Sequence, residues 1–225
     1  MAVNYGPSMV TSGLTMMLDA ANTKSYPGTG TAWSDLSGNG NNGTLVNSPT
    51  YSNTNLGGIT YNGTSQYTST GLTLSSAITA FTIQAAINPA SVTTKQGIIE
   101  TFAGGSNGFG VEILTTGLIS LFAFYSGGLY GVASTTPLVV NTAYILAGIW
   151  SNNILSLYVN GSLINSSATS GTLLPGGTIT LGSYPAGNTV FYNGTIYNAS
   201  IYANTSLTAD QITQNFNAYR GRYGI

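Results

Sequence analysis

The chain has almost no charge. Only 4% of its 225 residues are charged, four Lys or Arg against five Asp or Glu, and it contains no cysteine and no histidine. Typical soluble domains carry about 25% charged residues, so a basic groove for nucleic acid and a polybasic patch for a membrane are excluded by number. The missing histidine and cysteine exclude imidazole and thiolate metal sites, Ser-His and Cys-His catalysis, and disulfides.

The residues that remain are typical of an all-β protein. Hydrophobic residues make up 42% of the chain and aromatic residues 11%, which is enough for a core and argues against disorder. Gly, Ser, Thr and Asn supply turn formers and β-compatible polar residues without adding charge. A single domain over residues 1–225 is expected, because no linker, charge block or repeat divides the chain.

Short apolar runs between Gly, Asn and Ser clusters predict a dozen strands, at the spacing of a sandwich. The expected strands are residues 14–18, 43–46, 59–61, 81–87, 97–102, 108–114, 118–125, 129–134, 144–150, 154–159, 178–181 and 195–202. Asn160 and Gly161 predict a type I′ hairpin turn, because both residues tolerate positive φ. Leu155, Leu157 and Val159 are expected to share one face of the strand before that turn.

One helix is expected, at the C-terminal end of the chain. Thr208 is a helix N-cap residue, and Gln211 follows three residues later as its capping-box partner. Ile212, Phe216 and Tyr219 lie on one stripe at spacings of four and three, so the helix is expected to dock against a sheet. It is expected to end near residue 221.

Three segments contain recognisable motifs. They are residues 13–41, which end in Asp-Leu-Ser-Gly-Asn-Gly-Asn, residues 154–161, which end in Leu-Tyr-Val-Asn-Gly, and residues 201–224, which contain Leu-Thr-Ala-Asp-Gln-Ile. Together they resemble the laminin G-like branch of the concanavalin A-like lectin and glucanase superfamily, and the last is similar to the closing segment of versions from bacteriophages. The resemblance implies an all-β jelly roll: a concanavalin A-like sandwich of two antiparallel sheets with a short C-terminal helix.

Glycoside hydrolysis, which enzymes of this superfamily perform, needs two carboxylates that flank the scissile bond. The acidic run of those enzymes is absent, and Glu100 and Glu112 each stand alone in an expected strand. If the two strands pair, the glutamates approach one another and one pKa rises. The alternative is that each is a solvent-side residue or a partner of Lys95. We therefore predict that the protein is not an enzyme.

Calcium is the cofactor that the resemblance implies, since many laminin G-like domains bind it. Asp35 is the candidate ligand, with the backbone carbonyls of residues 39–42 as neutral partners. The other interpretation is that the Asp35 side chain caps a turn.

A glycan site needs an aromatic platform beside amide and hydroxyl groups. Tyr125 and Tyr130 flank an expected hairpin tip, Tyr184 and Tyr192 flank a loop rich in Gly and Asn, and Trp33 lies in an N-terminal loop. These five aromatic residues are the candidates for glycan binding. Aromatic residues in strands more often fill the core or form cross-strand pairs, which is the competing interpretation for each of them.

The sequence leaves three functions, which we rank. A nearly neutral surface associates without desolvating ions, which suits permanent assembly. With the bacteriophage-like closing segment and no secretory signal or apolar membrane span, this predicts a non-enzymatic structural protein of the virion surface: a capsid decoration, fibre or appendage subunit. Its partners would be other virion proteins or copies of itself, as a homo-oligomer. The alternative is a carbohydrate-binding lectin or adhesion module that recognises a host-surface or environmental glycan, and an unrecognised glycan hydrolase ranks third.

Overall fold

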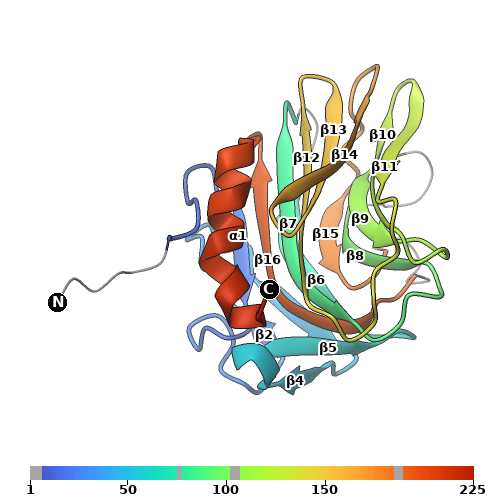
Figure 1. Ribbon diagram of the computed structural model, residues 1–225. Coiled ribbons are helices and arrows are strands. Elements are labelled where there is room, and N and C mark those ends of the chain that lie inside the picture. The colour runs from blue at the N-terminus through green and yellow to red at the C-terminus, as the bar shows by residue number, and fades with distance from the viewer. Residues whose placement is uncertain (1–6, 75–77, 102–106, 185–189) are drawn as a thin grey trace.

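The computed structural model describes residues 7–74, 78–101, 107–184 and 190–225. Two antiparallel eight-stranded sheets stack face to face, and one helix packs on the outside of the first sheet (Figure 1). The expected all-β sandwich with a short C-terminal helix is therefore confirmed.

The first sheet, called sheet A here, carries the helix. Its strand order is β14-β13-β12-β7-β16-β5-β4, and β1 pairs with β16 outside that path. In chain order the strands of sheet A are β1 Met16–Asp19, β4 Thr50–Ser52, β5 Gly58–Asn62, β7 Phe81–Pro89, β12 Tyr144–Ser151, β13 Ile154–Val159, β14 Ser162–Ala168 and β16 Asn193–Ala203.

The second sheet, sheet B, has the order β11-β10-β9-β8-β15-β6-β3-β2. Its strands are β2 Ala32–Trp33, β3 Gly43–Val46, β6 Tyr67–Thr73, β8 Gln96–Glu100, β9 Phe109–Ile113, β10 Ile119–Tyr125, β11 Gly128–Ala133 and β15 Thr178–Leu181, and a short 3-10 helix, η1 Thr54–Leu56, connects two strands of sheet A.

The core lies between the two sheets and is built from alternate residues of each strand. Phe81 of sheet A stacks on Phe109 of sheet B with ring centroids 3.9 Å apart, and Leu155 and Leu157 are fully buried in the same cluster. Alternation along the strands sends the intervening side chains to the outer face of each sheet. The outer faces are therefore where polar and functional side chains can gather.

Hairpin turns follow the asparagines. Asn160 and Gly161 both have positive φ, 51° and 78°, so the predicted type I′ turn between β13 and β14 is present. The turn between β12 and β13 uses Asn152 and Asn153, again both with positive φ. Asparagine tolerates this left-handed conformation better than other non-glycine residues, which explains why an Asn-Asn pair can replace Asn-Gly.

The C-terminal helix, α1 Ala209–Tyr223, begins with the predicted capping box between Thr208 and Gln211 and ends at Gly224 in the left-handed conformation. It extends two residues beyond the expected end near residue 221. Ile212 is buried against the outer face of sheet A, as the apolar stripe predicted.

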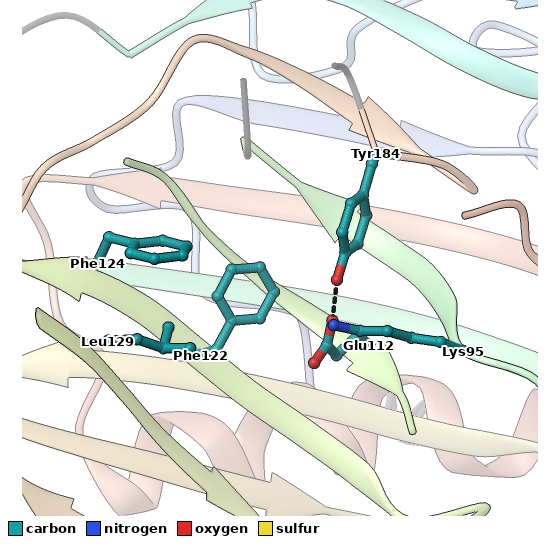
Figure 2. Close-up of a pocket in the computed structure, with 6 residues that line it drawn as sticks. All are labelled: Lys95, Glu112, Phe122, Phe124, Leu129 and Tyr184. Carbon is teal, nitrogen blue, oxygen red and sulfur yellow. Dashed lines mark hydrogen bonds and ion pairs between the residues drawn. The ribbon is translucent and has the colours of Figure 1, made fainter. Parts of the chain in front are cut away.

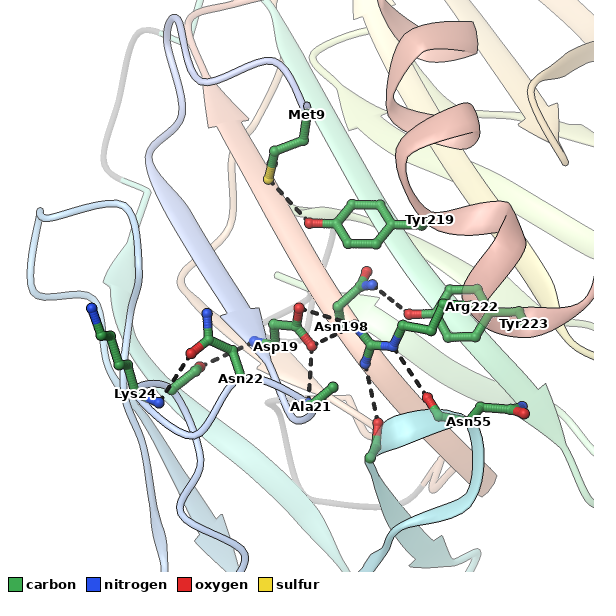
Figure 3. A network of polar contacts seen from close by, with 12 residues as sticks. Met9, Asp19, Ala21, Asn22, Lys24, Asn55, Asn198, Tyr219, Arg222 and Tyr223 are labelled. Atoms are coloured by element: carbon green, nitrogen blue, oxygen red, sulfur yellow. Dashed lines mark hydrogen bonds and ion pairs between the residues drawn. The ribbon is translucent and has the colours of Figure 1, made fainter. Parts of the chain in front are cut away.

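Polar contacts fix the last turn of α1 to the sheet (Figure 3). The Arg222 Nη1 lies 2.8 Å from the Asp19 Oδ1 at the end of β1, and the same guanidinium donates to the backbone carbonyls of Asn55 and Gly57. Tyr223 accepts a hydrogen bond from the Asn198 side chain on β16. The helix thus closes the outer face of sheet A, and the outer face of sheet B has no helix on it in the described part of the chain.

The sequence did not predict β2, β4 or β6. Strand β6 has the sequence Tyr-Thr-Ser-Thr-Gly-Leu-Thr, and its inward positions are mostly threonine, so it lacks the apolar alternation of a strand. Phe102, the last residue of one expected strand, lies outside the described residues. Among the described residues, none of the helical structure is long and apolar enough to cross a membrane.

Candidate functional site

A small cavity of about 100 Å³ opens on the outer face of sheet B. On β9, Val111 and Ile113 point into the core, so Glu112 between them points outward. On β10, Leu121 and Ala123 are core residues and the phenylalanines beside them face outward. The cavity is lined by Lys95, Glu112, Phe122, Phe124, Leu129 and Tyr184 (Figure 2), and we call these six residues the sheet B pocket.

One side of the sheet B pocket is an apolar wall. The rings of Phe122 and Phe124 meet edge to face, with centroids 6.2 Å apart, and Phe122 lies 6.4 Å from the ring of Tyr184. Leu129 pairs with Phe124 across β10 and β11 and is 59% exposed at the rim. Aromatic faces of this kind bind apolar surfaces of a ligand.

The other side of the pocket is polar. The Glu112 carboxylate accepts a short hydrogen bond from the Tyr184 hydroxyl, and its Oε2 lies 3.1 Å from the Lys95 Nζ. The Lys95 ammonium also lies 5.3 Å from the centroid of the Tyr184 ring. Burial and the two neighbouring glutamates raise the pKa of Tyr184, so its hydroxyl keeps its proton and acts as a donor.

A second carboxyl group lies next to the pocket. Strands β8 and β9 pair, with Glu100 opposite Gly110 and Gly97 opposite Glu112. Glu100 has no exposed surface, and neither of its side-chain oxygens has a hydrogen-bond partner among the described residues. Burial, with the nearby charge of Glu112, raises the pKa of Glu100 well above its usual value. The expectation that strand pairing would bring the two glutamates together is confirmed, and Glu112 is also the partner of Lys95.

Two glycines make room for this arrangement. A Cβ at Gly110 would collide with the Glu100 carboxyl group, and a Cβ at Gly97 would lie 2.9 Å from both the Glu100 Cγ and the Tyr184 ring. Any larger residue at either position would force these side chains to move. The close approach of Glu100 and Glu112 therefore depends on the absence of side chains at Gly97 and Gly110.

The five aromatic residues predicted to bind glycan do not gather at one site. Trp33, Tyr125 and Tyr192 are at most 2% exposed and belong to the core, so their faces are not available to a ligand and the structure does not support this role for them. Tyr130 is partly buried, packs edge to face on Tyr125, and its hydroxyl contacts Ser170. Tyr184 alone of the five lines the sheet B pocket.

Asp35 organises its own loop. Its Oδ1 accepts hydrogen bonds from the backbone amides of Met17 and Ser37, and its Oδ2 accepts from the Asn41 amide and the Ser37 hydroxyl. Partial burial acts to raise the pKa of Asp35, but these hydrogen bonds outweigh it and the pKa is lowered. The donors around Asp35 do not fit calcium, which needs six to eight oxygen ligands, and no group of three acidic residues lies together in the described chain. Calcium binding stays a prediction.

Most of the pocket could not be predicted from the sequence. Phe122 and Phe124 alternate with apolar core residues in an unbroken hydrophobic run. The sequence therefore did not show that these two side chains face outward. Leu129 and Lys95 carry no motif. The one available signal was Glu112 between Val111 and Ile113, because an acidic residue in a buried strand must point to the opposite face.

Solved structures of similar shape include a domain solved with a bound oligosaccharide. Domain 4 of AbnA, an extracellular arabinanase from Geobacillus stearothermophilus solved with arabinotriose, matches with a TM-score of 0.72 and 17% identity, over 91% of this chain and 98% of that domain. The binding domain of Paraclostridial mosquitocidal protein 1 matches with a TM-score of 0.72 and 15% identity, over 93% of this chain and 53% of that one.

A sialidase from Trypanosoma rangeli matches with a TM-score of 0.67 and 15% identity, over 94% of this chain and 33% of the sialidase. At these identities the likeness shows the fold alone, and the chain spans about a third of the sialidase. No curated protein sequence matches the chain significantly. Residues 62–213, more than half of the chain, match the laminin G-like family described as the concanavalin A-like lectin/glucanases superfamily, and the chain belongs to that family.

Proposed function

We propose that the protein is a carbohydrate-binding module and that the sheet B pocket is its glycan site. The observation that carries the proposal is the combination of an apolar wall, half-buried Phe124 and exposed Leu129, with a polar edge, Glu112 and Lys95, in one cavity. A sugar ring has an apolar face and a hydroxylated rim, so it matches this combination of wall and edge.

The relatives support the same class of ligand. The AbnA domain, which has the same fold over nearly its full length, was solved with arabinotriose. That ligand is a short neutral oligosaccharide, and it provides a first probe for this chain. The similar part of the mosquitocidal protein is likewise a binding domain.

We propose further that the module binds without hydrolysis. A general acid must reach the glycosidic oxygen, whereas Glu100 has no exposed surface in this fold. The Glu112 side chain is 6% exposed and is already engaged by Lys95 and Tyr184. A reducing-sugar assay tests this point: measurable turnover that disappears in Glu112→Gln would contradict it.

The binding experiment compares two leucines of similar exposure. A glycan array identifies ligands, and calorimetric titration with the strongest ligand and with arabinotriose measures affinity. Leu129→Ala, at the pocket rim, should weaken binding about tenfold, because roughly 50 Å² of apolar contact contributes about 1.3 kcal/mol. Leu163→Ala, on β14 and 54% exposed, is the matched control and should bind as the wild type does.

The same titration distinguishes the pocket from the hairpin tip. Phe124→Ala should abolish measurable binding, and Tyr130→Ala should leave it unchanged. Loss of binding in Tyr130→Ala with retention in Phe124→Ala would move the site to the tip. Absence of binding to every glycan on the array would contradict the proposed function.

A second candidate function is assembly, as a subunit of a larger particle such as a virion surface. Residues 113–209 contain no charged residue. Among the described residues, seven large hydrophobic side chains are exposed, and six of them lie in this uncharged stretch: Leu129, Val139, Val140, Ile154, Leu163 and Ile164. A groove of about 270 Å³ lies beside β14 and is lined by Val139, Val159 and Ile164 among others.

Strand β14 ends the strand order of sheet A and carries neither proline nor charge, which are the usual protections of a sheet edge. We propose that a second copy of this chain covers it. Light scattering of the purified protein should give a dimer or larger species, which Ile164→Asp converts to monomer. Leu56→Asp, at an exposed position outside the stretch, is the control. A monomeric wild type at high concentration would contradict the assembly role.

A further inference from the structure

We propose that the sheet B pocket selects glycans that carry a free, protonated amino group over their neutral counterparts. The inference rests on the proposed function, because it names the ligand class of the same site. Its basis is the position of the ammonium group of Lys95 between a carboxylate and an aromatic face.

The protein itself places an ammonium group in the pocket. The Lys95 Nζ lies 3.1 Å from the Glu112 Oε2 and 5.3 Å from the centroid of the Tyr184 ring. A carboxylate and an aromatic face are the two groups that attract a cationic nitrogen in a protein. Figure 2 shows Lys95 reaching this position from the side opposite Phe124 and Leu129. The amino group of a sugar resting on the phenylalanine wall would approach the same carboxylate from the side of Phe122.

Lys95 can leave this position at low cost. It lies directly before β8, and its side chain is 45% exposed, whereas that of Glu112 is 6% exposed. Because almost half of the Lys95 side chain is exposed, water can solvate its ammonium group once it leaves the carboxylate. A ligand ammonium can therefore replace Lys95 at the Glu112 carboxylate, and Lys95 then extends into solvent.

Glu100 adds to the attraction for a cation. It lies diagonally across from Glu112 on the paired strand and is fully buried, and its two carboxyl oxygens have no hydrogen-bond partner in the part of the chain that the structure describes. Burial and the charge of Glu112 raise the pKa of Glu100, whereas the positive charge of Lys95 acts to lower it. A ligand ammonium in the place of Lys95 would favour the ionised form of Glu100 in the same way.

The opposite ligand class is disfavoured at the same place. A sugar carboxylate drawn to Lys95 would lie against the Glu112 carboxylate, and the faces of the aromatic rings carry negative potential. Lys95 is also already neutralised by Glu112. The pocket therefore adds little affinity for acidic sugars and is expected to favour amino sugars.

The test uses two probes that differ in one group: the β-1,4-linked trimer of glucosamine, titrated at a pH where its amines are protonated, and its N-acetylated form. Wild type should bind the amine trimer about tenfold more tightly. Glu112→Gln should lose this preference while it still binds the acetylated trimer, since the phenylalanine wall is intact. Lys95→Met removes the competing ammonium and should raise affinity for the amine trimer, and Lys24→Met, a lysine distant from the pocket, should change nothing.

The possible outcomes separate the two proposals. Equal or tighter binding of the acetylated trimer by wild type overturns the amine selectivity and leaves the proposed function standing. Binding of neither trimer nor of any other glycan overturns the proposed function itself. If Glu112→Gln does not fold, Lys95→Met decides: an unchanged or weaker affinity for the amine trimer overturns the amine selectivity.

Discussion

The buried carboxyl of Glu100 should make the free energy of unfolding depend measurably on pH. Burial and the neighbouring charge of Glu112 raise its pKa well above the usual value, so folding favours the protonated form. The stabilisation is fully present below about pH 4.3, the pKa of an unfolded glutamate, and is lost as pH rises toward the raised pKa. Between these two values one proton is bound on folding, so the free energy of unfolding should fall by about 1.4 kcal/mol for each pH unit from this group.

Glu100→Gln tests this because the amide has the shape of the protonated acid and cannot ionise. Urea unfolding followed by tryptophan fluorescence, at half-unit steps above pH 4.3, gives the free energy of unfolding of both proteins. The variant should lack the slope, match the wild type near pH 4.3 and exceed its stability at higher pH. Asp210→Asn, in the exposed first turn of α1, controls for the loss of one negative charge. Equal slopes in wild type and Glu100→Gln would refute the reasoning, because Glu100 would then be ionised in the folded protein.

Three further variants probe the same geometry. Gly110→Ala should destabilise the fold by about 1–3 kcal/mol, since the new Cβ would collide with the Glu100 carboxyl and lie 2.6 Å from the Ile99 carbonyl oxygen. In a thermal melt, the double variant Gly110→Ala/Glu100→Ala should recover only part of this loss. A single variant as stable as the wild type would contradict the predicted crowding. Asp35→Ala should cost about 1 kcal/mol by leaving loop amides without their acceptor. The lowered pKa of Asp35 predicts that this difference shrinks as pH falls below about 3.9. A calcium-dependent rise in melting temperature that Asp35→Ala removes would support the calcium site, and the absence of any rise would contradict it. Arg222→Met should cost about 3 kcal/mol, because Asp19, 8% exposed, loses its partner; a loss below about 1 kcal/mol in urea unfolding would show that the pair does not fix α1.

Most of the fold could be predicted from the sequence, because the motifs that mark its turns and its helix are local. The Asn160-Gly161 turn and the capping box at Thr208 depend on residues within a few positions of one another, and both are present. Strand β6 was missed because Thr68 and Thr70 occupy its buried positions, where Thr68 bonds to the Tyr61 hydroxyl. A polar strand that satisfies its hydroxyls across the core has no apolar signature.

The site was harder to read because it depends on register between strands. Glu100 and Glu112 come together only because β8 pairs with β9 with a bulge between Gly97 and Ile99, which places consecutive isoleucines in the core and turns Glu100 outward. No spacing within one strand encodes that shift. Three of the five expected glycan-binding aromatic residues lie in the core. The sequence could not show this, because the sequence around a tyrosine such as Tyr125 is the same whether its side chain faces the core or the solvent.

The central claim is that the outer face of sheet B holds a glycan at the pocket between β9 and β10. The most direct measurement is a heteronuclear NMR titration of the labelled protein with arabinotriose and with the glucosamine trimer. We expect saturable shift changes centred on Glu112, Phe122 and Phe124, with the amide of Tyr184 among them. Shift changes centred on Tyr130, or no saturable change with either sugar or with a ligand from the glycan array, would contradict the claim.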